Sequence, residues 1–169
     1  MTAAGAGPEV GAGPLPGPLP HADLFHTGIV VDDLEAARDE LGRLFGVTWF
    51  EGGGEVRVLT DDGARTVRAA YALSQEGPHH IELAQAVPGT VWTAAAPGQA
   101  HHLGYWVDDV AAASAELARL GAPRVATIAP ADDAPPMCAY HRTSGPYVEV
   151  VSRAMRPVLL PKPGRGRMG

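Results

Sequence analysis

The chain has a single cysteine, no early positive charge and no long apolar run. One cysteine, Cys138, allows no intrachain disulfide, which fits a reducing compartment. It lies in the apolar run MCAY, where we expect a small buried side chain rather than a nucleophile or a ligand. No Lys or Arg precedes Arg38, so no secretory or transit signal is indicated. No run approaches the roughly 18 apolar residues of a membrane span, so we expect a soluble, cytoplasmic protein without membrane contact.

Positive charge is scarce and concentrated near the C-terminus. The net charge is −6 over 169 residues, which argues against nucleic acid as a partner. Residues 153–169 contain five Lys or Arg and no acid, so the remainder sums to −6 − 5 = −11. An anion contact is one interpretation of this segment, but we expect 154–169 to form a basic flexible tail.

The folded part contains an internal repeat. HTGIVVDDLEAARDELGRLFG begins at His26, and HLGYWVDDVAAASAELARLGA begins at His102. At this offset of 76, more than half of the positions from His26 to Phe45 are identical. Residues 1–21 are mostly Gly, Pro and Ala and are expected to be a disordered leader. We therefore divide the rest into a first module at 22–86, a linker at 87–100 and a second module at 101–153.

Each repeat predicts a strand followed by a helix. The strands are expected at 26–31 and 102–107, with Asp32 and Asp108 as helix N-caps and Glu35 completing a capping box. Each helix has one apolar stripe that suits packing on a sheet. Further strands are expected at 55–60, 65–73, 79–85, 123–128, 136–142 and 146–152. The predicted fold class is α+β: two βαβββ modules from an internal duplication, their curved mixed sheets forming a cleft with the helices outside.

The candidate functional side chains of each module lie on its first and last strands. His26 and His102 open the first strands, and Glu82 and Glu149 lie in the last strands, HIELAQ and YVEVVS. Side chains alternate along a strand, so these four turn to the concave face, and a glycine two residues after each histidine leaves room. Pseudo-twofold symmetry would bring them together, and two buried carboxylates need a cation between them. Two nitrogens and two oxygens suit a divalent ion such as Ni, Co, Zn, Mn or Fe.

Other residues are candidates for the surroundings of this site. Trp106 shares the face of His102, and Trp92 lies in the linker, whose two interpretations are a pocket wall and a plain connection. His80 shares the face of Glu82 and could orient it, and Tyr140 is expected in the core or at the pocket rim. These four form the predicted substrate pocket: Trp106, His80, Trp92 and Tyr140. His101 cannot share the face of His102 and is expected to face the helix side or solvent.

The repeated frame, with its HxG openings, its IEL and VEV closings and an SGP turn before the last strand, resembles the vicinal oxygen chelate superfamily. The likeness covers residues 22–152 and is greatest for the glyoxalase-like and methylmalonyl-CoA epimerase-like branch. Carried over by position, it implies metal ligation by His26, Glu82, His102 and Glu149, a set similar to that of glyoxalase I.

The resemblance implies an enzyme that uses Lewis-acid chemistry and Glu149 or Glu82 as a general base on a small oxygen-chelating substrate. Isomerisation, epimerisation and lyase reactions all fit, on a specialised metabolite or an acyl-CoA. The alternative is a metal-free protein that sequesters a ligand, similar to the bleomycin resistance proteins. An extradiol dioxygenase is less favoured, because four protein ligands leave little room for oxygen. The sequence leaves open whether the modules pair within one chain or exchange across a homodimer.

Overall fold

The computed structural model describes residues 17–94, 96, 99–131 and 133–161. Each half contains a strand, a helix and three more strands, in the predicted order. The first half comprises β1 (Leu24–Val31), α1 (Leu34–Phe45), β2 (Trp49–Thr60), β3 (Gly63–Ser74) and β4 (His80–Gln85). The second comprises β5 (His102–Val107), α2 (Val110–Arg119), β6 (Arg124–Ala129), β7 (Cys138–His141) and β8 (Tyr147–Ser152). Short helices flank them: η1 (His21–Asp23), η2 (Arg153–Met155) and α3 (Arg156–Leu159).

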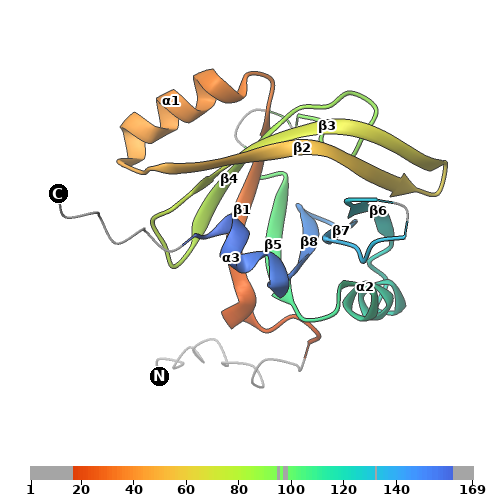
Figure 1. Cartoon of the computed structure of the whole chain (residues 1–169). Helices are drawn as coiled ribbons and strands as arrows, with labels where there is room; N and C mark the ends of the chain where they lie inside the picture. The colour runs from red at the N-terminus through yellow and green to blue at the C-terminus, as the bar shows by residue number, and fades with distance from the viewer. Residues whose placement is uncertain (1–16, 95, 97–98, 132, 162–169) are drawn as a thin grey trace, which may run out of the picture.

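The eight strands form one curved mixed sheet that closes on itself in the order β1-β4-β3-β2-β6-β7-β8-β5. Antiparallel pairing of β1 with β5, and of β2 with β6, joins the two halves. Both seams therefore lie within one chain. The helices α1 and α2 lie outside the sheet at opposite ends of the molecule (Figure 1). The predicted α+β class, with a curved mixed sheet and outer helices, is confirmed, while the common origin of the halves and the division into modules stay predictions.

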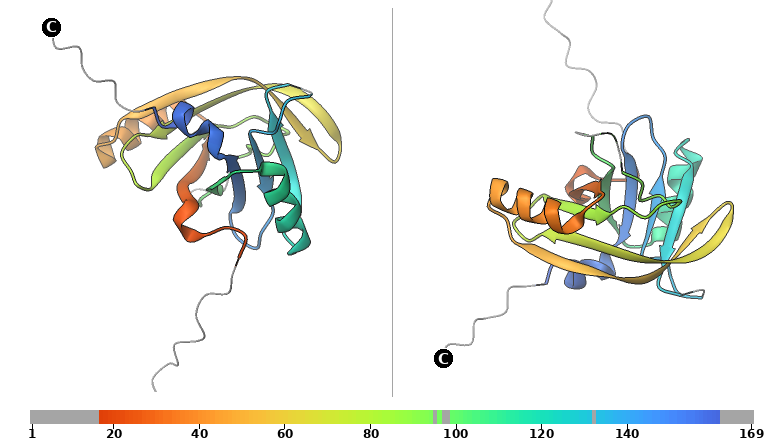
Figure 2. Two further views of the ribbon diagram at one scale, coloured as in Figure 1. Left: turned by 60° about the horizontal axis from the view of Figure 1, so that its bottom comes forward. Right: turned by 90° about the horizontal axis from the view of Figure 1, so that it is seen from above.

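The first hairpin is longer than expected, because β2 begins at Trp49 rather than at residue 55. Three consecutive glycines argue against a strand on propensity alone. They nevertheless pair with β3, Gly52 opposite Tyr71 and Gly54 opposite Ala69. A Cβ atom on Gly52 would lie 2.3 Å from the Tyr71 hydroxyl, so the glycine makes room for that ring. The long β2–β3 hairpin extends across one side of the molecule (Figure 2).

The helix caps differ from the prediction by one residue. Asp33 and Asp109 are the N-caps, and their carboxylates accept from the backbone N–H groups of Ala36 and Ala112. The expected caps Asp32 and Asp108 precede the turn into the helix, so the predicted capping box with Glu35 does not form. The helices also differ in packing: α2 buries Val110, Ser114 and Leu117, whereas α1 buries no residue fully and leaves Leu44 and Phe45 exposed.

The segment after β8 differs from a flexible tail as far as the structure describes it. Residues 153–159 form η2 and α3, and Met155, Leu159 and Leu160 pack against the core cluster of Phe25, Trp106 and Val151. Arg153 anchors the segment, its guanidinium lying 2.9 Å from Asp23 and 2.8 Å from Asp108. The rest of the tail, 162–169, and most of the leader, 1–16, lie outside the described residues. No helix of the described part could cross a bilayer.

Candidate metal centre

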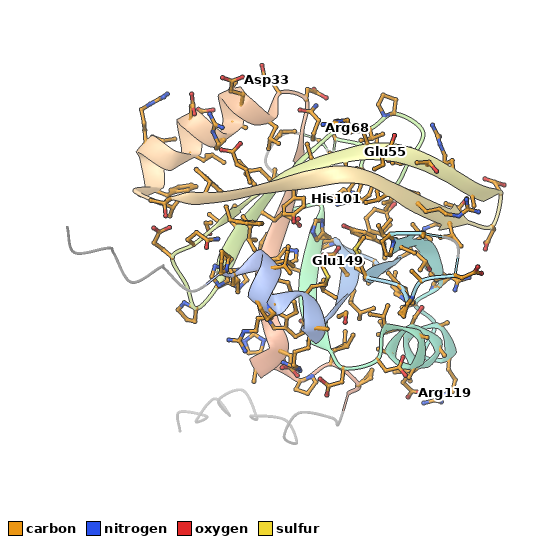
Figure 3. The ribbon with its side chains drawn as sticks, viewed as in Figure 1. Asp33, Glu55, Arg68, His101, Arg119 and Glu149 are labelled. Carbon is orange, nitrogen blue, oxygen red and sulfur yellow. The ribbon has the colours of Figure 1, made fainter. Side chains whose placement is uncertain are left out.

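Strand register brings the four predicted ligands together at the seam between β1 and β5. His26 lies opposite Gly104 and Gly28 lies opposite His102 in this antiparallel pair. On the outer side of each glycine comes a glutamate: β4 places Glu82 beside Gly28, and β8 places Glu149 beside Gly104. Each half therefore contributes a histidine and a glutamate to one point. In Figure 3 the labelled Glu149 and His101 lie at the centre of the molecule, whereas Asp33 and Arg119 lie at its periphery.

The two glycines make this convergence sterically feasible. A Cβ atom on Gly28 would lie 1.9 Å from Cε1 of His102, and one on Gly104 would lie 1.9 Å from Cε1 of His26. The sequence predicted that the glycines leave room, and the structure adds that each one accommodates the histidine of the other half.

The ligand atoms of the cluster lie within 4.8 Å of one another. The Nε2 atoms of His26 and His102 are 2.9 Å apart. Oε2 of Glu82 lies 3.1 Å from Nε2 of His26 and 2.9 Å from Nε2 of His102. Oε2 of Glu149 lies 3.1 Å and 3.5 Å from the same two nitrogens. Ligands about 2.1 Å from a common ion, at right angles to one another, would be about 3.0 Å apart, so the donor set fits a divalent cation.

Charge supports the same interpretation. Burial alone would lower the pKa of His26, but the nearby Glu82 and Glu149 raise it to about 9. Burial alone would raise the pKa of both carboxyl groups, but the two histidines hold them below their usual range. Two carboxylates and one protonated imidazole sum to −2 + 1 = −1 in a buried site. A divalent cation that displaced the imidazole proton would balance the two carboxylates, since −2 + 2 = 0, whereas an uncompensated buried charge is costly.

His101 is a residue whose position the sequence analysis predicted wrongly. It is buried, and its Nδ1 lies 2.8 Å from Nδ1 of His102, while its Nε2 lies 2.9 Å from the carbonyl oxygen of Val91. It lies just before β5, so strand alternation does not dictate its direction. The doublet of adjacent histidines was the only signal in the sequence that could have drawn attention to it.

A cavity of ≈ 120 Å³ adjoins the cluster. His26, Glu82 and Glu149 line it together with mostly apolar side chains. The predicted pocket residues Trp92 and Tyr140 belong to its wall, and the indole N–H of Trp92 donates to the Tyr140 hydroxyl over 3.1 Å.

Trp106 and His80 are not among the lining residues. Trp106 stacks on Phe25 with ring centroids 3.6 Å apart, which turns it into the cluster beneath α3. Nδ1 of His80 lies 2.7 Å from the Ser74 carbonyl oxygen, so this ring contacts the β3–β4 turn rather than Glu82.

Two further residues beside Glu149 carry protons. Burial, with Glu149 as a neighbour, raises the pKa of the Cys138 thiol and of the Tyr140 phenol well above their usual ranges. Both groups therefore stay protonated beside Glu149. Cys138, expected as a small buried side chain, is thus a polar neighbour of the centre.

Comparison with solved structures shows the fold. A methylmalonyl-CoA epimerase in complex with methylmalonyl-CoA and ammonium is 19% identical, with a TM-score of 0.51, over 78% of this chain and 94% of that one. A variant of the Streptomyces coelicolor methylmalonyl-CoA epimerase in complex with 2-nitronate-propionyl-CoA is 17% identical, with a TM-score of 0.52, over 78% and 96%. The Mycobacterium tuberculosis methylmalonyl-CoA epimerase is 19% identical, with a TM-score of 0.50, over 77% and 87%.

Sequence comparison shows the family. No curated protein sequence matches the chain. Residues 25–150, which include all four clustered side chains, match the family model described as Glyoxalase/Bleomycin resistance protein/Dioxygenase superfamily. The chain therefore belongs to the glyoxalase/bleomycin resistance protein/dioxygenase superfamily.

Proposed function

We propose that this protein is a divalent-metal enzyme that moves a proton on a carbon next to a substrate carbonyl, giving isomerisation, epimerisation or lyase chemistry. The observation that carries the proposal is the buried cluster of two imidazoles and two carboxylates at the wall of a cavity. His26, Glu82, His102 and Glu149 would hold the ion. When bound, it would act as a Lewis acid that polarises a substrate oxygen and stabilises the developing enolate.

The protein's own groups supply the proton transfer and the positioning. Glu82 and Glu149 both line the cavity, so either carboxylate can reach a substrate carbon as a general base. The remaining wall excludes water, since it is built mainly from side chains such as Val56, Leu73 and Ile128.

The cavity also indicates the kind of substrate. None of the described lining residues is Lys or Arg. The part of the substrate inside the cavity is therefore an apolar group with one or two oxygen atoms directed at the cluster, rather than a phosphate. An acyl-CoA fits only if its nucleotide stays outside the cavity, and an apolar specialised metabolite fits as well. The epimerase neighbours support the first class, since two of them hold acyl-CoA derivatives.

Metal content and proton exchange test the proposal. The purified protein is assayed for bound metals, stripped with a chelator and titrated with Ni²⁺, Co²⁺, Zn²⁺, Mn²⁺ and Fe²⁺ by calorimetry. Exchange of α-protons in D₂O is then followed by NMR for a panel of short acyl-CoA thioesters and α-hydroxyketones. We expect ion binding, ion-dependent exchange with at least one panel member, and loss of both in His102→Ala. The exposed His79→Gln variant is the matched control and should retain both.

A protein that binds none of the ions but retains affinity for a small apolar ligand would be a sequestering protein, and the proposal would be wrong.

A further inference from the structure

We infer that the two halves of the centre are inequivalent: His102 and Glu149 form a fixed half, and His26 and Glu82 form a mobile half. The inference rests on the proposed metal function but concerns which residues anchor the ion and which can release it. It follows from comparing matched positions in the two halves, where the neighbours of the four ligands differ.

Hydrogen bonds behind His102 determine its tautomer. The carbonyl oxygen of Val91 can only accept, so Nε2 of His101, 2.9 Å away, carries the proton. In neutral His101 the other ring nitrogen, Nδ1, is then an acceptor, and it lies 2.8 Å from Nδ1 of His102. His102 must therefore be protonated on Nδ1. In neutral His102 the lone pair is then on Nε2, the nitrogen that faces the cluster and would bind the ion.

The first half lacks this support. Phe25 occupies the place before His26 that His101 occupies before His102, and its ring meets that of His26 edge-on with centroids 4.3 Å apart. Nδ1 of His26 is buried and has no hydrogen-bond partner among the described residues. Apart from the cluster contacts of its Nε2, the His26 ring is positioned by packing, so a change of its orientation breaks no hydrogen bond at Nδ1. His101 is thus a positioning residue without a counterpart in the first half.

The two carboxylates differ as the two histidines do: the one in the second half has more support from its neighbours than the one in the first half. Across the β7–β8 pair Glu149 faces Tyr140, whose side chain carries a hydroxyl and is itself held by a hydrogen bond from the Trp92 indole. Across the β3–β4 pair Glu82 faces Leu73, whose side chain has no donor. The Glu149 side chain is 7% exposed and that of Glu82 is 17% exposed. Glu82 can therefore turn toward the cavity by giving up only its contacts with the two histidines.

This asymmetry assigns different duties to the two carboxylates. Glu149 stays with the ion, and Glu82 becomes the carboxylate that is free to act on substrate. In that step a Glu82 oxygen takes the proton from the substrate carbon, and the electron pair of the broken C–H bond enters the enolate. The protonated Glu82 then returns the proton to the same carbon or to its neighbour, which balances the reaction.

Two matched pairs of variants test the inference by Co²⁺ calorimetry on the full chain. Glu149→Gln should weaken Co²⁺ binding about 100-fold and Glu82→Gln about tenfold or less, since only the first removes a ligand that is almost fully buried and faces a hydroxyl-bearing residue, Tyr140. His101→Leu should weaken binding roughly 10–100-fold, as expected for loss of a group that orients a ligand. Phe25→Leu, at the matched position, should change it less than about threefold. Equal or reversed losses within either pair would overturn the inference.

A spectroscopic measurement separates the inference from the proposed function. Long-range ¹H–¹⁵N NMR of the metal-free protein distinguishes Nδ1–H from Nε2–H histidines. We expect His102 as the Nδ1–H tautomer in the wild type, loss of this state in His101→Leu, and its recovery in His101→Gln, whose amide oxygen can accept. If the wild type binds no ion, the proposed function fails while this result still decides the inference. An Nε2–H tautomer of His102 would refute it.

Discussion

Substitution of Gly28 by alanine on β1 should displace the ligand His102 on the neighbouring strand β5 and so weaken metal binding. The Cβ atom of Gly28→Ala would lie 1.9 Å from Cε1 of His102, whereas carbon atoms in contact are normally about 3.5–4.0 Å apart. The ring must therefore retreat by about 1.5–2 Å. His102 has 0% exposure, so it has no solvent-filled space to enter.

Overpacking of this kind costs about 1–3 kcal/mol. For a domain of this size, we expect a fall in Tm of roughly 2–12 °C. Displacing the ring also breaks its contact with His101, so Co²⁺ binding should weaken more than about 100-fold. Thermal unfolding of the metal-free protein by circular dichroism isolates the packing effect, and calorimetry gives the ion affinity.

The matched control is Gly145→Ala, whose added Cβ atom would meet nothing closer than Thr143 Oγ1 at 4.0 Å. It should leave both Tm and Co²⁺ affinity unchanged. If Gly28→Ala unfolds within about 1 °C of the wild type and binds Co²⁺ equally well, the histidine does not occupy the space above this glycine and our account of the seam is wrong.

Two further predictions concern pH and helix capping. The pKa of His26 is raised to about 9 by Glu82 and Glu149 against the opposing effect of burial, and a proton must leave before this ring can bind an ion. Co²⁺ affinity should therefore rise about tenfold per pH unit from pH 7 to 9, and a flat profile by calorimetry would contradict this assignment. A raised pKa stabilises the folded state below the unfolded value of 6.5, so the metal-free protein should lose stability as pH rises from 6.5 to 9, measured as Tm. Asp33→Ala should cost about 1 kcal/mol of unfolding free energy in urea titrations, because the N-cap of α1 is lost. Asp32→Ala is the control, and a larger loss in that variant would restore the cap predicted from the sequence.

The sequence predicts the cluster because its members lie inside regular strands. Period-two alternation assigns His26, His102, Glu82 and Glu149 to one face, and the repeat shows that both halves contribute. The sheet seams, with β1 beside β5 and β2 beside β6, agree with this symmetry, but the sequence did not predict that they form within one chain.

The wrong predictions fall at the ends of elements and where tertiary contacts override local preference. His101 precedes β5, so its direction is fixed by the Val91 carbonyl and the neighbouring ring rather than by alternation. Two aspartates in succession offer two possible caps, and only the point at which the chain turns into α1 selects Asp33. The glycines of β2 form a strand because β3 supplies a pairing partner.

Across the β1–β5 seam, the glycine of each half accommodates the histidine ring of the other half, so substitutions in the two halves depend on each other. A bulkier residue at position 28 becomes tolerable only when position 102 shrinks, and the same holds for positions 104 and 26. Neither half can therefore change the residues at these positions independently of the other half. A change of chemistry in this protein would have to arrive as paired substitutions, one on each strand.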